Sequence, residues 1–428
     1  MNEQRDTTFS ILKALAILLV VTAHAAAPTY LSRFAYMVSV PAFFVCAGYF
    51  FNSQYLQQKG TFVVRRARRL YLPFVKWSLL FLVLHNLFFP LGLLSETYGN
   101  AGGGVTHPYD WTTAMQNLWS IVFNMSGYDV FLAGAFWFFR ALFLSSIAFL
   151  LLFKGATCIK WLKNPTLQVT AVGTLTLLLA IWQSFDGLRI TGVAQGGYRE
   201  LMGITFMSIG FLFRHNTDSP VSVAWRHPAL GLAWSSLVLA LLVAFFPVAM
   251  TPSTGNPLAV VLLALAGPAA FVWLHAVAHY LSLLPRKVPE VIAYIGDNSI
   301  YIFGFHLLAF KLVSMIKVLA YGLPWEMVGN HPVVTFQRDD AFWIAYLLVG
   351  AGLPLLVVWS WRYFCTQFDF NWTRPADWGR LFLTISVGIW TGMKWLGRTS
   401  VRTSKKTAHG IAVTFKDIVT QSRTDDDN

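Results

Sequence analysis

The dominant pattern in this sequence is a series of long apolar stretches separated by short polar segments. Most stretches are close to the ~20 residues that an α-helix needs to cross the hydrocarbon core of a bilayer. Ten stretches stand out, of which the sixth is the shortest: residues 9–27, 34–51, 70–94, 130–153, 167–185, 201–213, 229–248, 258–284, 298–320 and 341–364. The pattern predicts an all-α polytopic membrane protein with about ten transmembrane helices.

The composition excludes a water-soluble globule. Of the 428 residues, 56% are hydrophobic and only 12% are charged, with a mean hydropathy of +0.55. So few polar side chains cannot cover the surface of a soluble protein of this size. The formal net charge of +13 could suggest a nucleic-acid partner, but the cations stand beside the apolar stretches. Lipid headgroups explain that placement, so we expect membrane lipids as partners and no nucleic acid.

The loops between the stretches alternate between rich and poor in Lys and Arg. Residues 52–69 hold Lys59 and four arginines, whereas residues 95–129 hold no Lys or Arg at all. Because cytoplasmic loops carry the excess of these cations, the alternation predicts that the N- and C-termini are both cytoplasmic.

The segments at the two ends need separate interpretation. Residues 381–393 are apolar but too short to span, and Arg380 and Lys394 flank them, so we expect an interfacial amphipathic segment over 378–398. The polar residues 399–428 predict a disordered cytoplasmic tail. Residues 25–27 imitate a signal-peptidase site, but nine further spans follow, so we expect an uncleaved first helix. One transmembrane domain is thus expected over residues 5–365, with no separate soluble catalytic domain.

His24 lies near the far end of the first apolar stretch, at a depth where an ionisable group is costly and indicates function. Lys13 stands eleven positions earlier, which brings the two side chains to within about 20° on one helix face and ~16 Å apart along the axis. Neutral imidazole can take a hydroxyl proton near pH 7, so His24 is a candidate general base. The alternative is a structural histidine that is hydrogen-bonded to a neighbouring helix.

An arginine cluster precedes the third stretch. If the third helix extends to this point, Arg66 and Arg69 (i, i+3) and Arg65 and Arg69 (i, i+4) project from one face. Guanidinium groups bind phosphate in a bidentate manner, so this face suits a multiply phosphorylated ligand. The alternative is an anchor on lipid headgroups that only sets the topology.

Further polar residues lie inside the apolar stretches. Arg140 must face the bundle or a wet cavity, either as a ligand of donor phosphate or acceptor or as half of an ion pair. His306 is a candidate second polar group at the reaction centre, or an interhelical contact. We expect Lys317 to extend toward the outer interface and Lys311 to line a cavity. His275 and His279 have the spacing of a metal pair but no acidic or Cys partner nearby, and three isolated cysteines predict neither a disulfide framework nor a metal site.

Five segments together resemble the membrane acyltransferase-3 family. In the first helix of that family an Arg and a His hold the places of Lys13 and His24. The other four segments are similar to its Val-Pro-x-Phe-Phe-x-x-Ser-Gly-Tyr, Arg-x-x-Arg-Leu, Trp-Phe and Gly-x-x-Ser-x-x-x-Tyr-x-x-His patterns: residues 40–49 (Val-Pro-Ala-Phe-Phe-Val-Cys-Ala-Gly-Tyr), 66–70 (Arg-Ala-Arg-Arg-Leu), 137–138 (Trp-Phe) and 296–306 (Gly-Asp-Asn-Ser-Ile-Tyr-Ile-Phe-Gly-Phe-His). This chain departs from the family at four positions, with Ser10 for Asp, Lys13 for Arg, Ala47 for Ser and Phe303 for Tyr.

The resemblance implies an O-acyltransferase of the bacterial cytoplasmic membrane. Such an enzyme takes the acyl group, commonly acetyl, from acyl-CoA and transfers it to a hydroxyl of a carbohydrate or lipid-linked glycan. On this chain the resemblance implies His24 and His306 as catalytic residues, and Lys13, Arg66 and Arg69 as donor-binding residues. Arg140 is a further candidate for donor binding because of its place inside an apolar stretch. Two other classes stay open: a glycan or lipid transporter, in which the buried His and cations form a polar pathway, and an inactive scaffold, which the departures from the family would allow.

Overall fold

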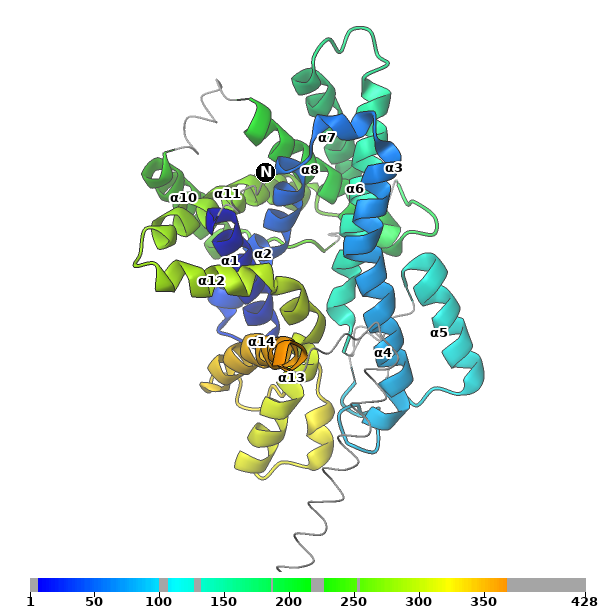
Figure 1. The fold of residues 1–428 in the computed structure, drawn as a ribbon, viewed down its shortest axis with the longest axis vertical. Coiled ribbons are helices and arrows are strands. Elements are labelled where there is room, and N and C mark those ends of the chain that lie inside the picture. The colour runs from blue at the N-terminus through cyan, green and yellow to red at the C-terminus, as the bar shows by residue number, and fades with distance from the viewer. Residues whose placement is uncertain are drawn as a thin grey trace, which may run out of the picture. The chain divides into compact units, whose positions relative to one another are not determined.

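The computed structural model describes residues 7–99, 107–126, 132–185, 188–216, 227–251 and 255–367. Within these ranges the regular secondary structure is helical (Figure 1). The α-helices are α1 (Thr7–His24), α2 (Thr29–Tyr49), α3 (Lys59–Arg66), α4 (Leu72–Phe88), α5 (Trp111–Asn124), α6 (Trp137–Ala156), α7 (Pro165–Ser184), α8 (Tyr198–His215), α10 (Pro228–Phe245), α11 (Pro257–Ser282), α12 (Lys287–Asp297), α13 (Ser299–Ala320) and α14 (Phe342–Gln367). Short helical segments are η1 (Ser53–Leu56), η2 (Ala67–Tyr71), η3 (Gly134–Phe136), η4 (Ala194–Gly197) and η5 (Trp325–Gly329).

Nine helices in the described ranges are long and apolar enough to cross a membrane, and each coincides with a predicted stretch. They are Thr7–His24, Thr29–Tyr49, Lys59–Phe88, Gly134–Ala156, Pro165–Ser184, Pro228–Phe245, Pro257–Ser282, Ser299–Ala320 and Phe342–Gln367. The remaining predicted stretch, 201–213, lies in α8, whose 18 residues include Arg199, Glu200 and Arg214. The all-α multi-pass architecture is confirmed, and the orientation in the membrane stays a prediction.

The chain divides into two units, residues 1–358 and residues 359–428. Of the second unit the structure describes residues 359–367, which form the end of α14. The expected interfacial segment 378–398 and the expected tail 399–428 lie outside the described residues. Both therefore stay predictions, as does the domain boundary at residue 365.

The third membrane helix begins earlier than its apolar stretch. It runs from Lys59 through α3, one π-helical turn (η2) and α4 to Phe88, and Figure 1 shows it as one long column. The first part of this helix, α3, is amphipathic and packs on the protein through Phe62. This residue is buried and lies edge-on to Phe51, with the ring centroids 5.4 Å apart. The arginine cluster is therefore helical, as the sequence hypothesis required.

Helix α1 is enclosed by its neighbours, because α2, α11, α12 and α13 all pack against it. Glycines allow the closest approaches. A Cβ on Gly296 would collide with the Ser10 carbonyl of α1, and a Cβ on Gly48 of α2 would collide with the Met207 carbonyl of α8. Small residues of this kind let membrane helices pack backbone to backbone.

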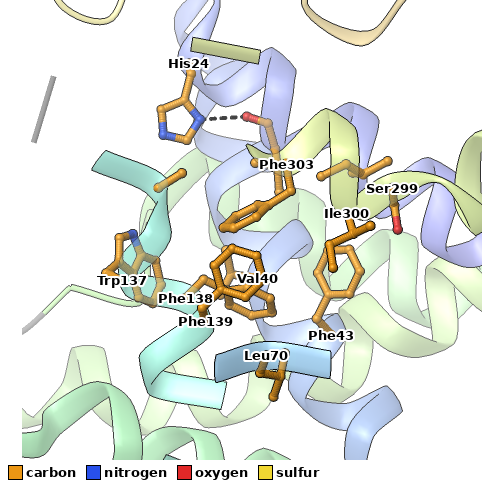
Figure 2. Close-up of a pocket in the computed structure, with 13 residues that line it drawn as sticks. His24, Val40, Phe43, Leu70, Trp137, Phe138, Phe139, Ser299, Ile300 and Phe303 are labelled. Atoms are coloured by element: carbon orange, nitrogen blue, oxygen red, sulfur yellow. Dashed lines mark hydrogen bonds between the residues drawn. The ribbon is translucent and has the colours of Figure 1, made fainter. Parts of the chain in front are cut away.

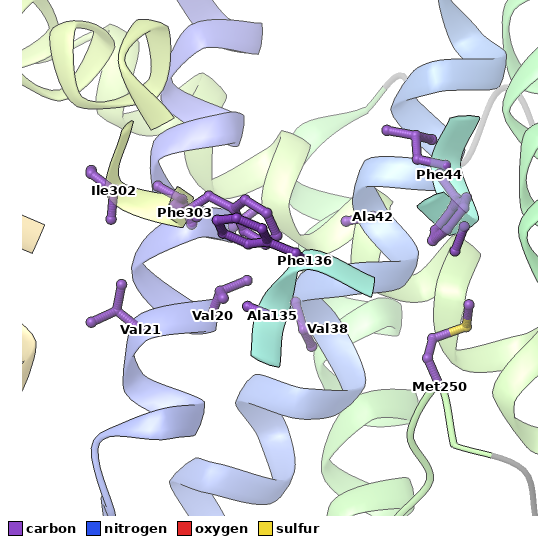
Figure 3. Packing of buried hydrophobic residues seen from close by; sticks show 14 of the residues in the cluster. Val20, Val21, Val38, Ala42, Phe44, Ala135, Phe136, Met250, Ile302 and Phe303 are labelled. Carbon is purple, nitrogen blue, oxygen red and sulfur yellow. The ribbon is translucent and has the colours of Figure 1, made fainter. Parts of the chain in front are cut away.

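A cluster of buried apolar side chains fills the space between α1, α2, the start of α6 and α13. Figure 3 shows Val20, Val38, Phe136 and Phe303 converging there, with the rings of Phe136 and Phe303 stacked at 6.1 Å. Since the far end of α1 borders this cluster, any polar group there is held in a largely dry environment.

Candidate functional site

His24 is the last residue of α1, and a hydrogen bond fixes its ring. Its Nδ1 lies 2.8 Å from the carbonyl oxygen of Val20, one turn earlier. A carbonyl oxygen only accepts, so Nδ1–H is the donor, and in the neutral ring Nε2 carries no proton. The side chain is only partly buried. His24 is thus held in the tautomer that a general base needs.

His306 of α13 lies directly beside His24. Their ring centroids are 5.3 Å apart, and the ring of Tyr36 is 5.8 Å from His24 on another side. The Nδ1 of His306 is 3.1 Å from the Ile302 carbonyl and 3.0 Å from the Phe303 carbonyl, so it also donates to its own helix. Its Nε2 is buried and makes no hydrogen bond within the described part of the chain. The two histidines named from sequence therefore form one pair.

The His24 cavity, a space of about 130 Å³, opens beside this residue (Figure 2). Besides His24, its lining is almost entirely apolar and comes from α1, α2, η2, η3, α6 and α13. The lining residues are Ile17, Val20, His24, Val40, Phe43, Leu70, Ala135, Trp137, Phe138, Phe139, Ser299, Ile300 and Phe303. Such a lining excludes water and strengthens electrostatic interactions with any group that enters.

The basic cavity, of about 320 Å³, lies toward the opposite end of α1. Lys13, Arg65, Arg66 and Arg69 line it, together with the rings of Phe9, Phe43, Phe50, Tyr55 and Phe62 and the side chains of Cys46, Ala47 and Leu142. Arg68 of the same cluster is exposed and is not part of this lining. The three arginines predicted to share one helix face thus do share one cavity.

Lys13 is held at the rim of the basic cavity by an acidic residue that sequence reasoning passed over. Its Nζ donates to Oδ1 of Asp297 at 3.3 Å, and the hydroxyl of Ser10 donates to the same oxygen at 2.9 Å. Asp297 ends α12, directly before α13. This contact orients the ammonium group and connects α1 to the end of α12, two residues before α13 begins.

The two cavities share a wall. Phe43 lines both, and Leu70, which lines the His24 cavity, follows directly on Arg69, which lines the basic cavity. Along α1 the distance from Lys13 to His24 is eleven residues, or ~16 Å. A ligand with a phosphorylated end and a long thin arm could therefore occupy both cavities.

Arg140 is not brought into either cavity lining. It is buried on α6, and its Nη2 donates to the Gly192 carbonyl at 3.1 Å.

The two lysines of α13 are also held by local contacts. Lys311 donates to the carbonyls of Val328 and Asn330 at 3.0 and 2.8 Å. Lys317 is 2% exposed and pairs with Asp340 at 2.8 Å, and its extension toward the outer interface stays a prediction.

The described residues contain no group of three or more His, Cys, Asp or Glu placed to hold a metal ion. His275, one half of the histidine pair noted in the sequence, packs its ring 5.6 Å from that of Phe9.

Comparison with known proteins now decides the family. The family model for an acyltransferase domain matches residues 7–336, which include both cavities. The chain belongs to the membrane acyltransferase-3 family. Over 248 residues it is also 27% identical to the peptidoglycan O-acetyltransferase OatA of Listeria monocytogenes, a match that takes in 53% of this chain and 37% of that protein. The chain thus spans well under half the length of this relative. No solved structure matches it.

The departures of this acyltransferase from its family all lie at the cavities or their rims. Ala47 lines the basic cavity, Phe303 lines the His24 cavity, and Ser10 and Lys13 share the carboxylate of Asp297. Asp297 stands out in the sequence as an acid at the edge of an apolar stretch, but the sequence does not reveal its partners on α1. Glu200 is the second acid that sequence reasoning missed, and the charges of Arg140 and Arg199 act on it.

Proposed function

We propose that this acyltransferase transfers an acyl group, in the simplest case acetyl, from acyl-CoA to a hydroxyl of a carbohydrate or lipid-linked glycan. The observation that carries the proposal is the position of His24, in its base tautomer, on the wall of an apolar cavity that adjoins a cavity lined by cations. The similarity to a peptidoglycan O-acetyltransferase of Listeria monocytogenes supports a glycan acceptor. We also propose the bacterial cytoplasmic membrane as its location.

The donor would bind with its phosphates in the basic cavity. Arg66, Arg69 and Lys13 offer guanidinium and ammonium donors there, and the first two suit bidentate contacts with phosphate. The pantetheine arm would pass Phe43 and bring the thioester into the apolar cavity beside His24. The dry lining would protect the thioester from hydrolysis.

The reaction needs one base and a return of the same proton. Nε2 of His24 would take the proton of the acceptor hydroxyl while its oxygen attacks the thioester carbonyl carbon. The tetrahedral intermediate collapses as the carbon–sulfur bond breaks, and the imidazolium gives the proton to the departing thiolate. The products are the ester and CoA with a free thiol. His306 would support the ring of His24 through the contact at 5.3 Å.

Donor binding offers a test with a matched control in the same arginine cluster. Arg66→Gln and Arg69→Gln should each weaken the binding of labelled acetyl-CoA to the purified protein by about 10-fold, since a charge-assisted hydrogen bond contributes ~1.5–3 kcal/mol. Arg68→Gln should leave binding within about twofold, because Arg68 does not line the cavity. Equal losses in all three variants, or none, would contradict the donor site.

A further inference from the structure

A second polar cluster lies where α6 and α8 begin, and no part of the donor path uses it. It consists of Trp137 and Arg140 of α6 and Arg199 and Glu200 of α8, and is called here the Trp137 cluster. The Arg199 guanidinium carbon lies 3.7 Å from the centroid of the Trp137 ring, and its Nε donates to the Met250 carbonyl at 3.0 Å. Arg140 is 7% exposed and Glu200 is 8% exposed.

Two polar atoms in this cluster lack hydrogen bonds. The Nε of Arg140 and the Oε2 of Glu200 are buried and make none within the described residues. The two arginines act electrostatically on the Glu200 carboxylate, yet no ion pair within 4.0 Å joins Arg140 to Glu200 in the described part of the chain. Buried charges that keep open hydrogen-bonding positions are costly, and such positions require an explanation. A polar ligand that accepts from Arg140 and donates to Glu200 would satisfy both.

Trp137 connects this cluster to the reaction centre. Its side chain lines the same cavity as His24, and Figure 2 shows both residues at this cavity. On the orientation that the loop charges predict, α6 and α8 begin on the side away from the cytoplasm. The cluster and the basic cavity would then lie toward opposite faces of the membrane.

We propose that Trp137, Arg140 and Glu200 form the acceptor subsite, which binds one sugar ring and directs a hydroxyl toward His24. An aromatic face packs against the C–H face of a pyranose, while a carboxylate and a guanidinium bind its hydroxyls and amide groups. The proposal rests on the proposed function, since it supplies the second substrate of that reaction.

The charge of the cluster also predicts which sugars it accepts. Two arginines and one glutamate give a formal charge of +1. A sugar with a free ammonium group would be repelled, whereas an N-acetylated sugar carries no charge and offers an amide. The subsite should therefore prefer N-acetylated over free hexosamine.

The test measures binding of the N-acetylglucosamine trimer and of the glucosamine trimer to the purified full-length protein. The structure predicts that the N-acetylated trimer binds at least about 10-fold more tightly, and that Glu200→Gln and Trp137→Phe each weaken its binding about 10-fold. Trp161→Phe is the control, because Trp161 is 72% exposed and lines neither cavity. Trp137→Phe keeps an aromatic ring at the cavity, so it tests the subsite even where Glu200→Gln fails to fold.

Acetyl-CoA binding by Glu200→Gln separates this proposal from the donor site, because Glu200 lines neither cavity. It should stay within about twofold of the wild type, which shows that this variant is folded. Unchanged trimer binding in both variants, absence of trimer binding to the wild type, or tighter binding of the glucosamine trimer would overturn the subsite and leave the donor site standing. A different result would overturn the proposed function instead: a wild-type protein that binds no acetyl-CoA but binds the trimer, with the trimer binding lost in Glu200→Gln.

Discussion

Individual site residues differ in how far the sequence reveals them. His24, His306, Arg66 and Arg69 could be predicted, because each is an ionisable group in or beside an apolar stretch and each stands at a family motif position. Asp297 and Glu200 could not be assigned a role, because their partners on α1 and α6 are far away in the chain. The partner of Lys317 could not be predicted for the same reason, since Asp340 lies in the loop after the next helical segment.

The Lys317–Asp340 pair gives a prediction at this scale. Asp340→Asn keeps an oxygen that accepts the hydrogen bond from the Phe342 amide at 3.0 Å. It removes the negative charge that compensates Lys317, whose side chain is 2% exposed. Leaving one charge of a buried pair unmatched destabilises a protein by roughly 3–5 kcal/mol. Thermal unfolding in detergent should show a clearly lower Tm.

The matched control is Glu290→Gln, which breaks the exposed pair with Arg286, and its Tm should stay close to that of the wild type. Equal Tm values for the two variants would show that the Lys317–Asp340 pair does not stabilise the fold.

At the scale of helices, the apolar stretches predicted where helices occur but not how they pack. In a membrane most helix faces are apolar, so periodicity does not reveal which face meets a neighbour, and only small residues indicate close contact. The π-helical turn at η2 and the close contact of α2 with α8 were therefore not predictable. A shared arginine face requires that the third helix extend to the arginine cluster, and the structure meets this condition, because the helix begins at Lys59.

Gly48 tests the packing of α2 on α8. Gly48→Ala would place a methyl group against the Met207 carbonyl, so the helices must shift. Overpacking of this kind costs about 1–3 kcal/mol, and we expect a lower Tm in detergent and reduced acyl transfer.

Gly155→Ala in α6 makes the same chemical change where no atom lies within 4 Å of the added Cβ. It should leave the Tm unchanged or raise it slightly, since Ala favours the helix over Gly by ~1 kcal/mol. If the Tm of Gly48→Ala equalled or exceeded that of Gly155→Ala, the close contact of α2 with α8 would be contradicted.

At the scale of the whole molecule, we propose that the donor and the acceptor meet at His24. The basic cavity and the Trp137 cluster both adjoin the His24 cavity, through Phe43 and Trp137 respectively. The loop charges predict that the donor enters from the cytoplasm and the acceptor from the opposite side. The sequence could indicate the proposed donor site, because its arginines are nearly contiguous in the chain. It could not indicate the proposed acceptor subsite, because the residues of that subsite come from the starts of two helices that are separated by α7.

The most direct test measures transfer across the membrane in inside-out vesicles that enclose the N-acetylglucosamine trimer. Labelled acetyl-CoA is added outside, at the cytoplasmic face, to vesicles with the wild type or with His24→Ala. Wild-type vesicles should transfer label to the enclosed sugar, and His24→Ala should lower the rate by at least ~10²-fold, the typical contribution of a general base, while still binding acetyl-CoA. Transfer at the wild-type rate by His24→Ala would contradict the account.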